Sequence, residues 1–241
     1  MKNQTVYFLA ITVLFAFCSC KSTAILRASF ESDAVDSPPA TNLQGEPSGD
    51  VIQFNPALQP MLVVKNSTTA GEKALHFVNS PLSGDISPSD KWVSFKGINT
   101  NLAETIWFTF TASNVSPNGN VLIDVTDGHA HIIARMRIKP DGELGLASDV
   151  LDDYTDVIGN VGTGNHTIVF TCMFSDLKYN VTVFKSSGNI TATDKPMIVT
   201  NPLHFSNPAN PMLSFRHSGA TSTNHKYVVE NILISRKKPD M

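Results

Sequence analysis

The sequence predicts an all-β protein, a sandwich or jelly roll of two antiparallel sheets, and three observations support this fold class. Short segments of alternating apolar and polar residues recur along most of the chain. Because successive side chains of a strand point to opposite sides, each such segment has one core face and one polar face. Turn sequences rich in Gly, Pro and Asn separate the segments, and no segment keeps helical periodicity over three turns. Many short strands between regular turns are typical of sandwiches and jelly rolls.

The composition of the chain bears on the class of partner and on the number of domains. Only 16% of the 241 residues are charged, and the formal net charge is −3. No basic block suggests a nucleic-acid partner, and no acidic tail suggests disorder. Pro and Gly are spread along the chain rather than gathered in one linker, so we expect a single domain after the N-terminal segment.

The N-terminus, residues 1–19, predicts a secretory signal peptide. Lys2 supplies a positive charge, and residues 6–17 are apolar except for Thr12. This run is shorter than the roughly 20 residues that cross a bilayer. It also lacks the polar face of an amphipathic core helix, which is the alternative interpretation. A basic start, a short apolar run and small residues after it are typical of exported proteins.

The four residues at the end of this segment and just after it, Phe17-Cys18-Ser19-Cys20, resemble the lipobox of bacterial lipoproteins. The resemblance implies cleavage before Cys20 and attachment to the membrane through lipid on Cys20. Cys18 stands where Ala, Ser or Thr is more usual, but it is small enough to be tolerated. Stable attachment needs more than one acyl chain. The alternative is a secreted protein that is cleaved a few residues later, in which a disulfide with Cys172 would be possible. The expected organisation is a signal peptide (1–19), a lipidated cysteine with a short tether (20–25) and a β-sandwich domain (26–241).

Three neighbouring segments, residues 104–112, 121–126 and 129–138, show the strand alternation most clearly. Their apolar faces carry Ile106, Phe108, Phe110, Val121, Ile123, Val125, Ala130, Ile132, Ala134, Met136 and Ile138. Their other faces carry Trp107, Thr109, Thr111, Leu122, Asp124, Thr126, His129, His131, Ile133, Arg135 and Arg137. The turn sequences around them are Ser116-Pro117-Asn118-Gly119, Asp127-Gly128 and Pro140-Asp141-Gly142.

Further strands are expected along the rest of the chain, at residues 26–30, 51–54, 75–78, 91–96, 166–174, 179–185, 213–217 and 227–235. Within one of them Cys172 alternates with apolar residues, so it is expected in the core as a small hydrophobe. The acidic cluster of Asp149, Asp152, Asp153 and Asp156 is expected in a solvated loop.

The order of these segments resembles that of concanavalin A-like and laminin G-like domains. The resemblance covers residues 25–238 and is carried by ASFESDAVDSPPA, ETIWFTFTA, NVLIDVTDG, HIIARMRIKPDGELGL, GNHTIVFTCMFSDLKYNVTVFKSSG and KYVVENILISRKK. It implies a two-sheet jelly roll whose members bind sugars, cleave polysaccharides, or serve in adhesion and scaffolding. The chain departs from the pattern at Glu230, where the closing strand usually has Asp, and in having no Trp beside His166.

No catalytic residue is assigned, and we expect a binding protein rather than an enzyme. The hydrolases of this fold carry Glu-x-Asp-x-x-Glu on one strand, and the sequence has no such triplet. A polysaccharide lyase or glycosidase is the alternative, with Tyr154 or His131 as the base. A structural subunit of an envelope assembly is a further alternative.

The predicted ligand-binding face carries Trp107, Asp124, His131, Arg135 and Arg137. These side chains would point the same way if the three strands were neighbours, and in a curved sandwich that surface could be concave. Aromatic rings stack on sugars, and Arg and Asp hydrogen-bond hydroxyl groups. Two arginines would also suit an acidic polysaccharide. The alternative is an ordinary solvent-facing surface with Trp107 packed under a loop. Arg135 is expected to be exposed under either interpretation.

No cofactor is expected, although two groups of residues resemble parts of a metal site. His129 and His131 share a strand face, but two ligands are too few for zinc. Family resemblance suggests a structural calcium ion held by Glu31 and perhaps Glu230, and hard oxygen ligands would suit it.

The function predicted from sequence is a lipid-anchored, non-catalytic module of the cell envelope that binds a glycan or an envelope protein. An outer-membrane location follows from the lipobox. Lys21-Ser22-Thr23 contains no acidic residue of the kind that often follows the cysteine of surface-displayed lipoproteins, which favours the periplasmic side.

Overall fold

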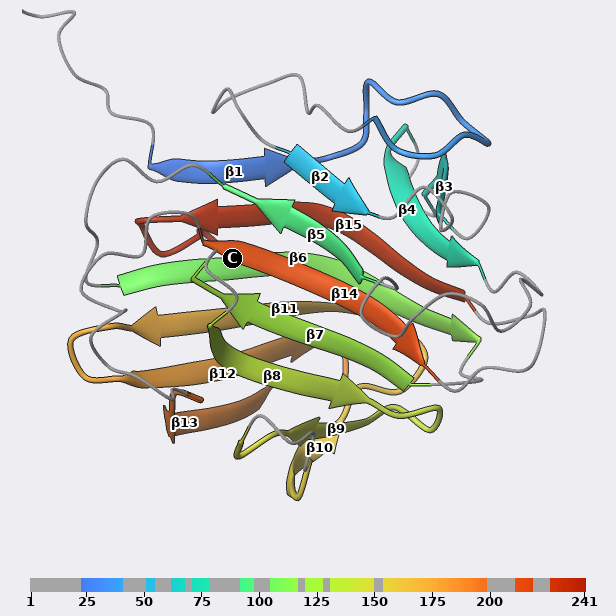
Figure 1. Cartoon of the computed structure of the whole chain (residues 1–241). Helices are drawn as coiled ribbons and strands as arrows, with labels where there is room; N and C mark the ends of the chain where they lie inside the picture. The colour runs from blue at the N-terminus through green and yellow to red at the C-terminus, as the bar shows by residue number, and fades with distance from the viewer. Residues whose placement is uncertain are drawn as a thin grey trace, which may run out of the picture.

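The computed structural model describes residues 23–40, 51–54, 62–67, 71–78, 92–97, 105–116, 120–127, 131–149, 154–198, 211–218 and 226–241. These residues form fifteen strands and no helix, arranged as two sheets packed face to face (Figure 1). Within these ranges no helix is long and apolar enough to span a membrane. The predicted all-β, two-sheet antiparallel sandwich is therefore confirmed. The predicted signal peptide and Cys20 lie outside the described residues.

The eight-stranded sheet has the order β13-β12-β11-β6-β15-β4-β3, and β1 pairs with β15 beside this path. All its neighbours are antiparallel. Its strands are β1 (Ala24–Ala28), β3 (Leu62–Asn66), β4 (Lys73–Val78), β6 (Thr105–Ser116), β11 (Asn165–Met173), β12 (Lys178–Lys185), β13 (Ile190–Pro196) and β15 (Lys226–Ser235).

The seven-stranded sheet lies in front of it in Figure 1 and has the order β10-β9-β8-β7-β14-β5-β2. Its pairs are also antiparallel. Its strands are β2 (Val51–Phe54), β5 (Trp92–Lys96), β7 (Asn120–Thr126), β8 (Ile132–Ile138), β9 (Glu143–Leu146), β10 (Asp156–Asn160) and β14 (Met212–Ser218).

Every strand expected from the alternation is present, with ends shifted by a few residues, and four strands were missed. The missed strands are β3, β9, β10 and β13. Two of them have little apolar character on either face: none of the five residues of β10 is fully buried, and one of the seven in β13 is. The expected loop around residues 149–156 is wrong at its end, because Asp156 begins β10 and forms an ion pair with Lys195 at 2.6 Å.

One continuous apolar core fills the space between the sheets. Both sheets contribute alternate residues to it, so the inward faces are almost fully inaccessible to solvent. Phe215 shows how tightly they meet, because its ring lies edge-on to Phe110 with 5.0 Å between the ring centroids. Cys172 is fully buried in this core, as predicted, and burial raises the pKa of its thiol.

A bulge at the start of β8 corrects the predicted faces of this strand. Val125 pairs with Ala134 and Thr126 pairs with Ile132, so Ile133 is the extra residue. Ile133 points into the main core, whereas Ile132 packs on the outer face of the sheet. The prediction placed them the other way round, because simple alternation cannot show where a strand carries an inserted residue. His129 and Ala130 lie outside the described residues.

His166 begins β11 and lies almost fully buried beside Tyr227 of β15. Its Nδ1 is 3.0 Å from the carbonyl oxygen of Gly164, and its Nε2 is 3.3 Å from the Tyr227 hydroxyl. The neutral ring satisfies both contacts by donating to Gly164 and accepting from Tyr227. Burial is the main cause that lowers the His166 pKa below its usual value, and the nearby charge of Lys185 lowers it further.

This buried histidine predicts a pH dependence of stability. Between the lowered folded pKa and the unfolded value of about 6.5, only the unfolded chain takes up the proton. The unfolding free energy is therefore complete above about pH 6.5 and falls as the pH drops below it. Urea unfolding of wild type and His166→Gln at several pH values should give a steeper acid-side loss for wild type. Equal slopes would contradict the prediction.

Candidate functional site

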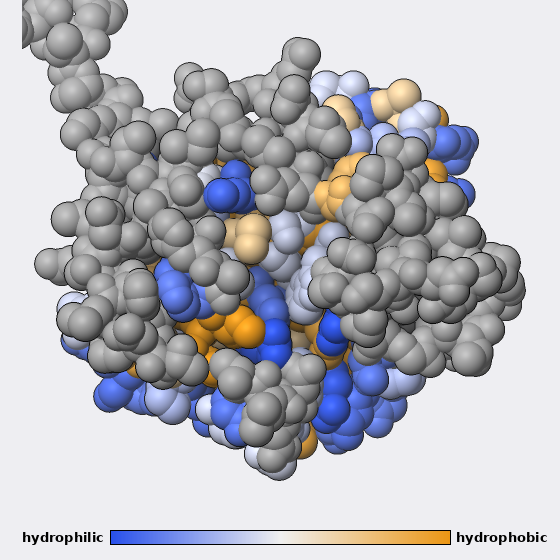
Figure 2. Space-filling view, viewed as in Figure 1, coloured by the Kyte–Doolittle hydropathy of each residue, from blue (hydrophilic) through white to orange (hydrophobic). Residues whose placement is uncertain are grey.

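A second, smaller apolar cluster lies on the outer face of the seven-stranded sheet. It contains the buried residues Leu122, Ala147, Tyr154 and Ile198, with Trp92 and Ile132 packed against them. The backbone N–H of Ile198 donates to the carbonyl oxygen of Ile133 at 2.9 Å, which fixes this segment against β8. Figure 2 views the molecule from this side and shows hydrophilic residues next to an apolar patch. This face therefore carries both a small apolar cluster and polar side chains beside it.

Five residues, Trp92, Arg216, Leu122, Arg137 and Tyr154, form a line across this face that we call the arginine row. Strand pairing sets its order, because Arg216 lies opposite both Trp92 and Leu122, and Leu122 lies opposite Arg137. The Arg137 guanidinium carbon lies 4.6 Å from the centre of the Tyr154 ring. The Arg216 guanidinium carbon lies 5.0 Å from the ring centre of Trp92. Each arginine is thus stacked on its own aromatic ring.

Stacking leaves the guanidinium groups suited to binding. A guanidinium that lies on a ring keeps its N–H donors in its own plane, where they can form two parallel bonds to a carboxylate. Strands are spaced by about 4.8 Å, so the backbones of Arg137 and Arg216, two strands apart, are separated by about 10 Å. An extended oligosaccharide could contact both arginines at once.

Arg137 also carries an unused donor. Its Nε is buried and has no hydrogen-bond acceptor among the described residues. A buried donor without an acceptor typically costs about 1–3 kcal/mol of stability.

Gly145 of β9 makes the position of Tyr154 possible. Gly145 lies opposite Arg137 in the sheet, and residue 154 passes directly over it. A Cβ at residue 145 would lie 3.0 Å from the Tyr154 carbonyl oxygen and 3.1 Å from the Tyr154 Cβ. Only glycine leaves room for the backbone of Tyr154 at this distance, which in turn places its ring beneath Arg137.

Asp124 and Arg135 lie in the neighbouring line of this face and bind each other. The Arg135 Nε donates to Asp124 Oδ1 at 2.7 Å, and its Nη2 donates to Oδ2 at 2.8 Å. Only 5% of Asp124 and 9% of Arg135 are exposed. The next strands continue this line with Ser214 and Ser94, whose hydroxyl oxygens are 2.8 Å apart. The bidentate pair of Asp124 and Arg135 therefore lies next to the arginine row and stabilises the same face of the sheet.

The structure brings together only part of the predicted ligand face. Asp124, Arg135 and Arg137 do share the outer face of β7 and β8. The expectation of an exposed Arg135 is wrong, because Asp124 and the surrounding packing enclose it. His131 precedes β8, where its Nδ1 lies 2.7 Å from Oδ2 of the fully buried Asp127.

Trp107 does not belong to this face. It lies half-buried on β6, in the other sheet, opposite Thr171 and Ser235. The prediction assumed that the strands before and after the turn at residues 117–119 pair with each other. Instead β6 pairs with β11 and β15, and β7 pairs with β8 and β14. The chain crosses from one sheet to the other between them, so adjacency in sequence gives the wrong neighbour.

Only Arg137 of the arginine row belongs to the predicted ligand face. Trp92 and Arg216 were missed, Leu122 was placed on the outer face without a role, and Tyr154 was named only as a possible base of the alternative enzyme. The alternation in β5 and β14 does place Trp92 and Arg216 on the less buried face of their strands. Nothing in the sequence signals that β14 lies between β7 and β5, so the pairing of distant segments hid the site. Tyr154 precedes the missed strand β10.

The predicted calcium ligands are occupied by other partners. Glu31 Oε1 accepts the backbone N–H of Lys73 at 2.8 Å, and Glu230 Oε1 accepts the Ser67 hydroxyl. The Lys73 ammonium donates to the carbonyl oxygens of Glu31 and Asp33 at 2.8 and 2.7 Å. In the described part of the chain, no group of three or more His, Cys, Asp or Glu is placed to hold a metal ion.

No family model matches the sequence, and a comparison with curated proteins finds no match. Solved structures do match the fold. A sialidase has a TM-score of 0.53 at 13% identity over 88% of this chain and 18% of its own. The binding domain of Paraclostridial mosquitocidal protein 1 has a TM-score of 0.55 at 11% identity over 92% of this chain and 51% of its own.

A third match is the binding domain of botulinum neurotoxin DC, solved in complex with rat synaptotagmin II. Its TM-score is 0.51 at 13% identity, covering 92% of this chain and 50% of its own. The chain thus spans a small part of the sialidase and about half of each toxin binding domain. Matches at such low identity show the fold alone, and the chain is a two-sheet antiparallel β-sandwich.

The close approach at Gly145 gives a test of how the arginine row is held. Gly145→Ala should push the Tyr154 backbone outward and destabilise the protein by about 1–3 kcal/mol, as crowded substitutions do. Gly164→Ala is the matched control, because a Cβ there meets nothing within 4 Å. Chemical denaturation measures both changes. A loss no larger at residue 145 than at residue 164 would contradict the packing described above.

Proposed function

We propose that this chain is a carbohydrate-binding module of the cell envelope and that its ligand lies along the arginine row. The observation that carries the proposal is the pairing of two arginines with two aromatic rings on one outer face. The jelly-roll fold, shared with a sialidase and with toxin binding domains, is consistent with such a role.

An acidic glycan fits this row better than a neutral one. A carboxylate accepts two parallel N–H bonds from a guanidinium, and such charge-assisted bonds are about twice as strong as neutral ones. The nearby carboxylate of Asp124 forms its bidentate pair with Arg135. Leu122 lies between the two arginines and gives an apolar surface against which a sugar ring can pack.

The cellular setting is proposed from the sequence. The lipobox at Phe17-Cys18-Ser19-Cys20 would attach the domain to the outer membrane through Cys20, and the neutral-to-basic residues after it favour the periplasmic face. Few residues separate Cys20 from β1, so the domain would stay close to the bilayer. A chain extends by at most about 3.5 Å per residue.

The glycan proposal predicts a selective loss of affinity. Titrating acidic oligosaccharides such as oligouronates should give binding that Arg137→Ala weakens by about 10–100-fold, the size of a lost hydrogen bond to a charged group. A neutral oligosaccharide of equal length should bind more weakly than the acidic one. Arg137→Lys should bind the acidic oligosaccharide almost as weakly as Arg137→Ala, because an ammonium group cannot form the planar pair of bonds.

Trp107→Ala is the control for this titration, since Trp107 lies on the other sheet and should leave the affinity unchanged. Wild-type affinity in Arg137→Ala would refute the arginine row as the binding site. Cleavage of the oligosaccharide during the titration would show that the module is an enzyme.

The anchoring proposal predicts that Cys20→Ala releases the protein from the membrane fraction, because the lipid can be attached nowhere else. Cys18→Ala should leave anchoring intact, since Cys18 departs with the signal peptide. Cell fractionation measures both variants. A Cys20→Ala protein that remains in the membrane fraction would exclude the lipobox interpretation.

A further inference from the structure

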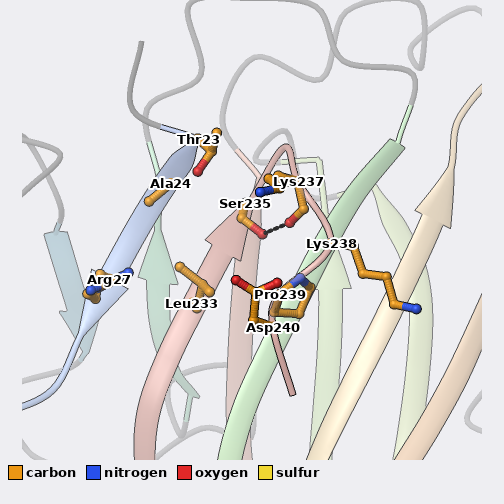
Figure 3. Close-up of a pocket in the computed structure, with 9 residues that line it drawn as sticks. All are labelled: Thr23, Ala24, Arg27, Leu233, Ser235, Lys237, Lys238, Pro239 and Asp240. Carbon is orange, nitrogen blue, oxygen red and sulfur yellow. Dashed lines mark hydrogen bonds between the residues drawn. The ribbon is translucent and has the colours of Figure 1, made fainter. Parts of the chain in front are cut away.

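A pocket of about 290 Å³ lies where the described chain begins and ends, on the opposite sheet from the arginine row (Figure 3). Its lining includes Thr23 and Arg27 near β1, Leu233 and Ser235 of β15, and Lys237 and Lys238 after β15. Arg27 and Leu233 are opposite each other in the sheet, and their strand neighbours Leu26, Ala28, Ile232 and Ile234 fill the core. The pocket therefore opens on the outer face of the eight-stranded sheet.

Two hydrogen bonds fix the segment after β15 against the start of β1. The backbone N–H of Arg236 donates to the carbonyl oxygen of Thr23 at 2.8 Å. The Ser235 hydroxyl donates to the carbonyl oxygen of Lys237 at 2.7 Å, so the segment turns back over the sheet. The residues that follow β15 are thereby held next to Thr23.

This arrangement gathers positive charge in a chain whose formal net charge is −3. Arg27, Lys237 and Lys238 are exposed, and none of the ion pairs among the described residues involves them. Half-buried Arg236 adds a fourth cation. Asp240 is the one carboxylate that lines the pocket. The surface formed by Arg27, Lys237 and Lys238 is called the basic rim below.

The basic rim also lies next to the proposed anchor. Thr23 is three residues after Cys20 in the sequence, a distance of at most about 10 Å at the extension limit of a chain. A lipid on Cys20 would place the phosphates of the same leaflet within reach of this rim. Each lysine or arginine near an anionic leaflet raises the affinity of the protein for the membrane by about fivefold.

We infer that the basic rim docks the domain on anionic phospholipid headgroups, with the phosphate of a headgroup at the mouth of the pocket. This inference rests on the proposed anchoring at Cys20 for its geometry. Docking through the eight-stranded sheet would turn the seven-stranded sheet, and with it the arginine row, away from the bilayer. The anchor would then hold the domain at the membrane and the basic rim would orient it.

Flotation of the full chain carrying Cys20→Ala tests this docking without a lipid anchor. Vesicles of phosphatidylcholine alone are compared with vesicles that contain phosphatidylglycerol. We expect stronger binding to the anionic vesicles. The ratio of the affinities for anionic and neutral vesicles should fall by about 100-fold in Arg27→Gln/Lys237→Gln/Lys238→Gln. Asp240→Asn should strengthen binding to anionic vesicles, because it removes the carboxylate of the pocket.

The matched control is Lys139→Gln/Lys178→Gln/Lys195→Gln, which changes the net charge equally but at lysines paired with carboxylates elsewhere. It should keep most of the preference for anionic vesicles. Equal binding to both kinds of vesicle, or equal losses in the two triple variants, would overturn the docking. Because Cys20 is absent throughout, this failure is separate from a failure of anchoring, which cell fractionation reports.

Discussion

The burial of one apolar face from every strand in a single core is the constraint on which the rest of this structure depends. Because side chains alternate, fixing residues such as Ile123 and Phe215 in the core fixes their neighbours Leu122 and Arg216 on the outside. A slip of one residue would expose a row of core side chains to water. The positions of the outer residues are therefore set by apolar burial rather than by their own interactions.

The same constraint explains what the sequence could and could not predict. Alternation predicts the strands and which side chains face outward, and the neighbouring strands β7 and β8 bring Asp124 to Arg135 as expected. The arginine row needs β14 between β7 and β5. These two pairings join segments about 90 and about 120 residues apart, and no local pattern encodes them. Trp107 was misplaced for the same reason, and Ile133 because a bulge interrupts the alternation.

Burial separates the arginines of this face into two kinds. Arg135 is enclosed and satisfied by both oxygens of Asp124, and removing one partner of such a buried pair typically costs about 3–5 kcal/mol. Arg137 and Arg216 are less buried and lie on aromatic rings, where cation–π contacts contribute only about 0.5–2 kcal/mol. The first arginine holds the sheet surface in place, whereas the other two are the arginines that we propose as ligand contacts.

The two sheets present opposite outer faces, and their chemistry differs in a way that suits a tethered binding protein. The basic rim gathers exposed cations at the end of the eight-stranded sheet that the N-terminal chain enters, whereas the arginine row lies on the seven-stranded sheet. A lipid tether alone leaves a domain free to rotate, so a ligand site would face the bilayer part of the time. In the docking that we propose, weak charge attraction on the sheet opposite the site would remove those orientations. The sandwich keeps the two surfaces apart, because its sheets pack against each other through their inner faces and their outer faces point in opposite directions.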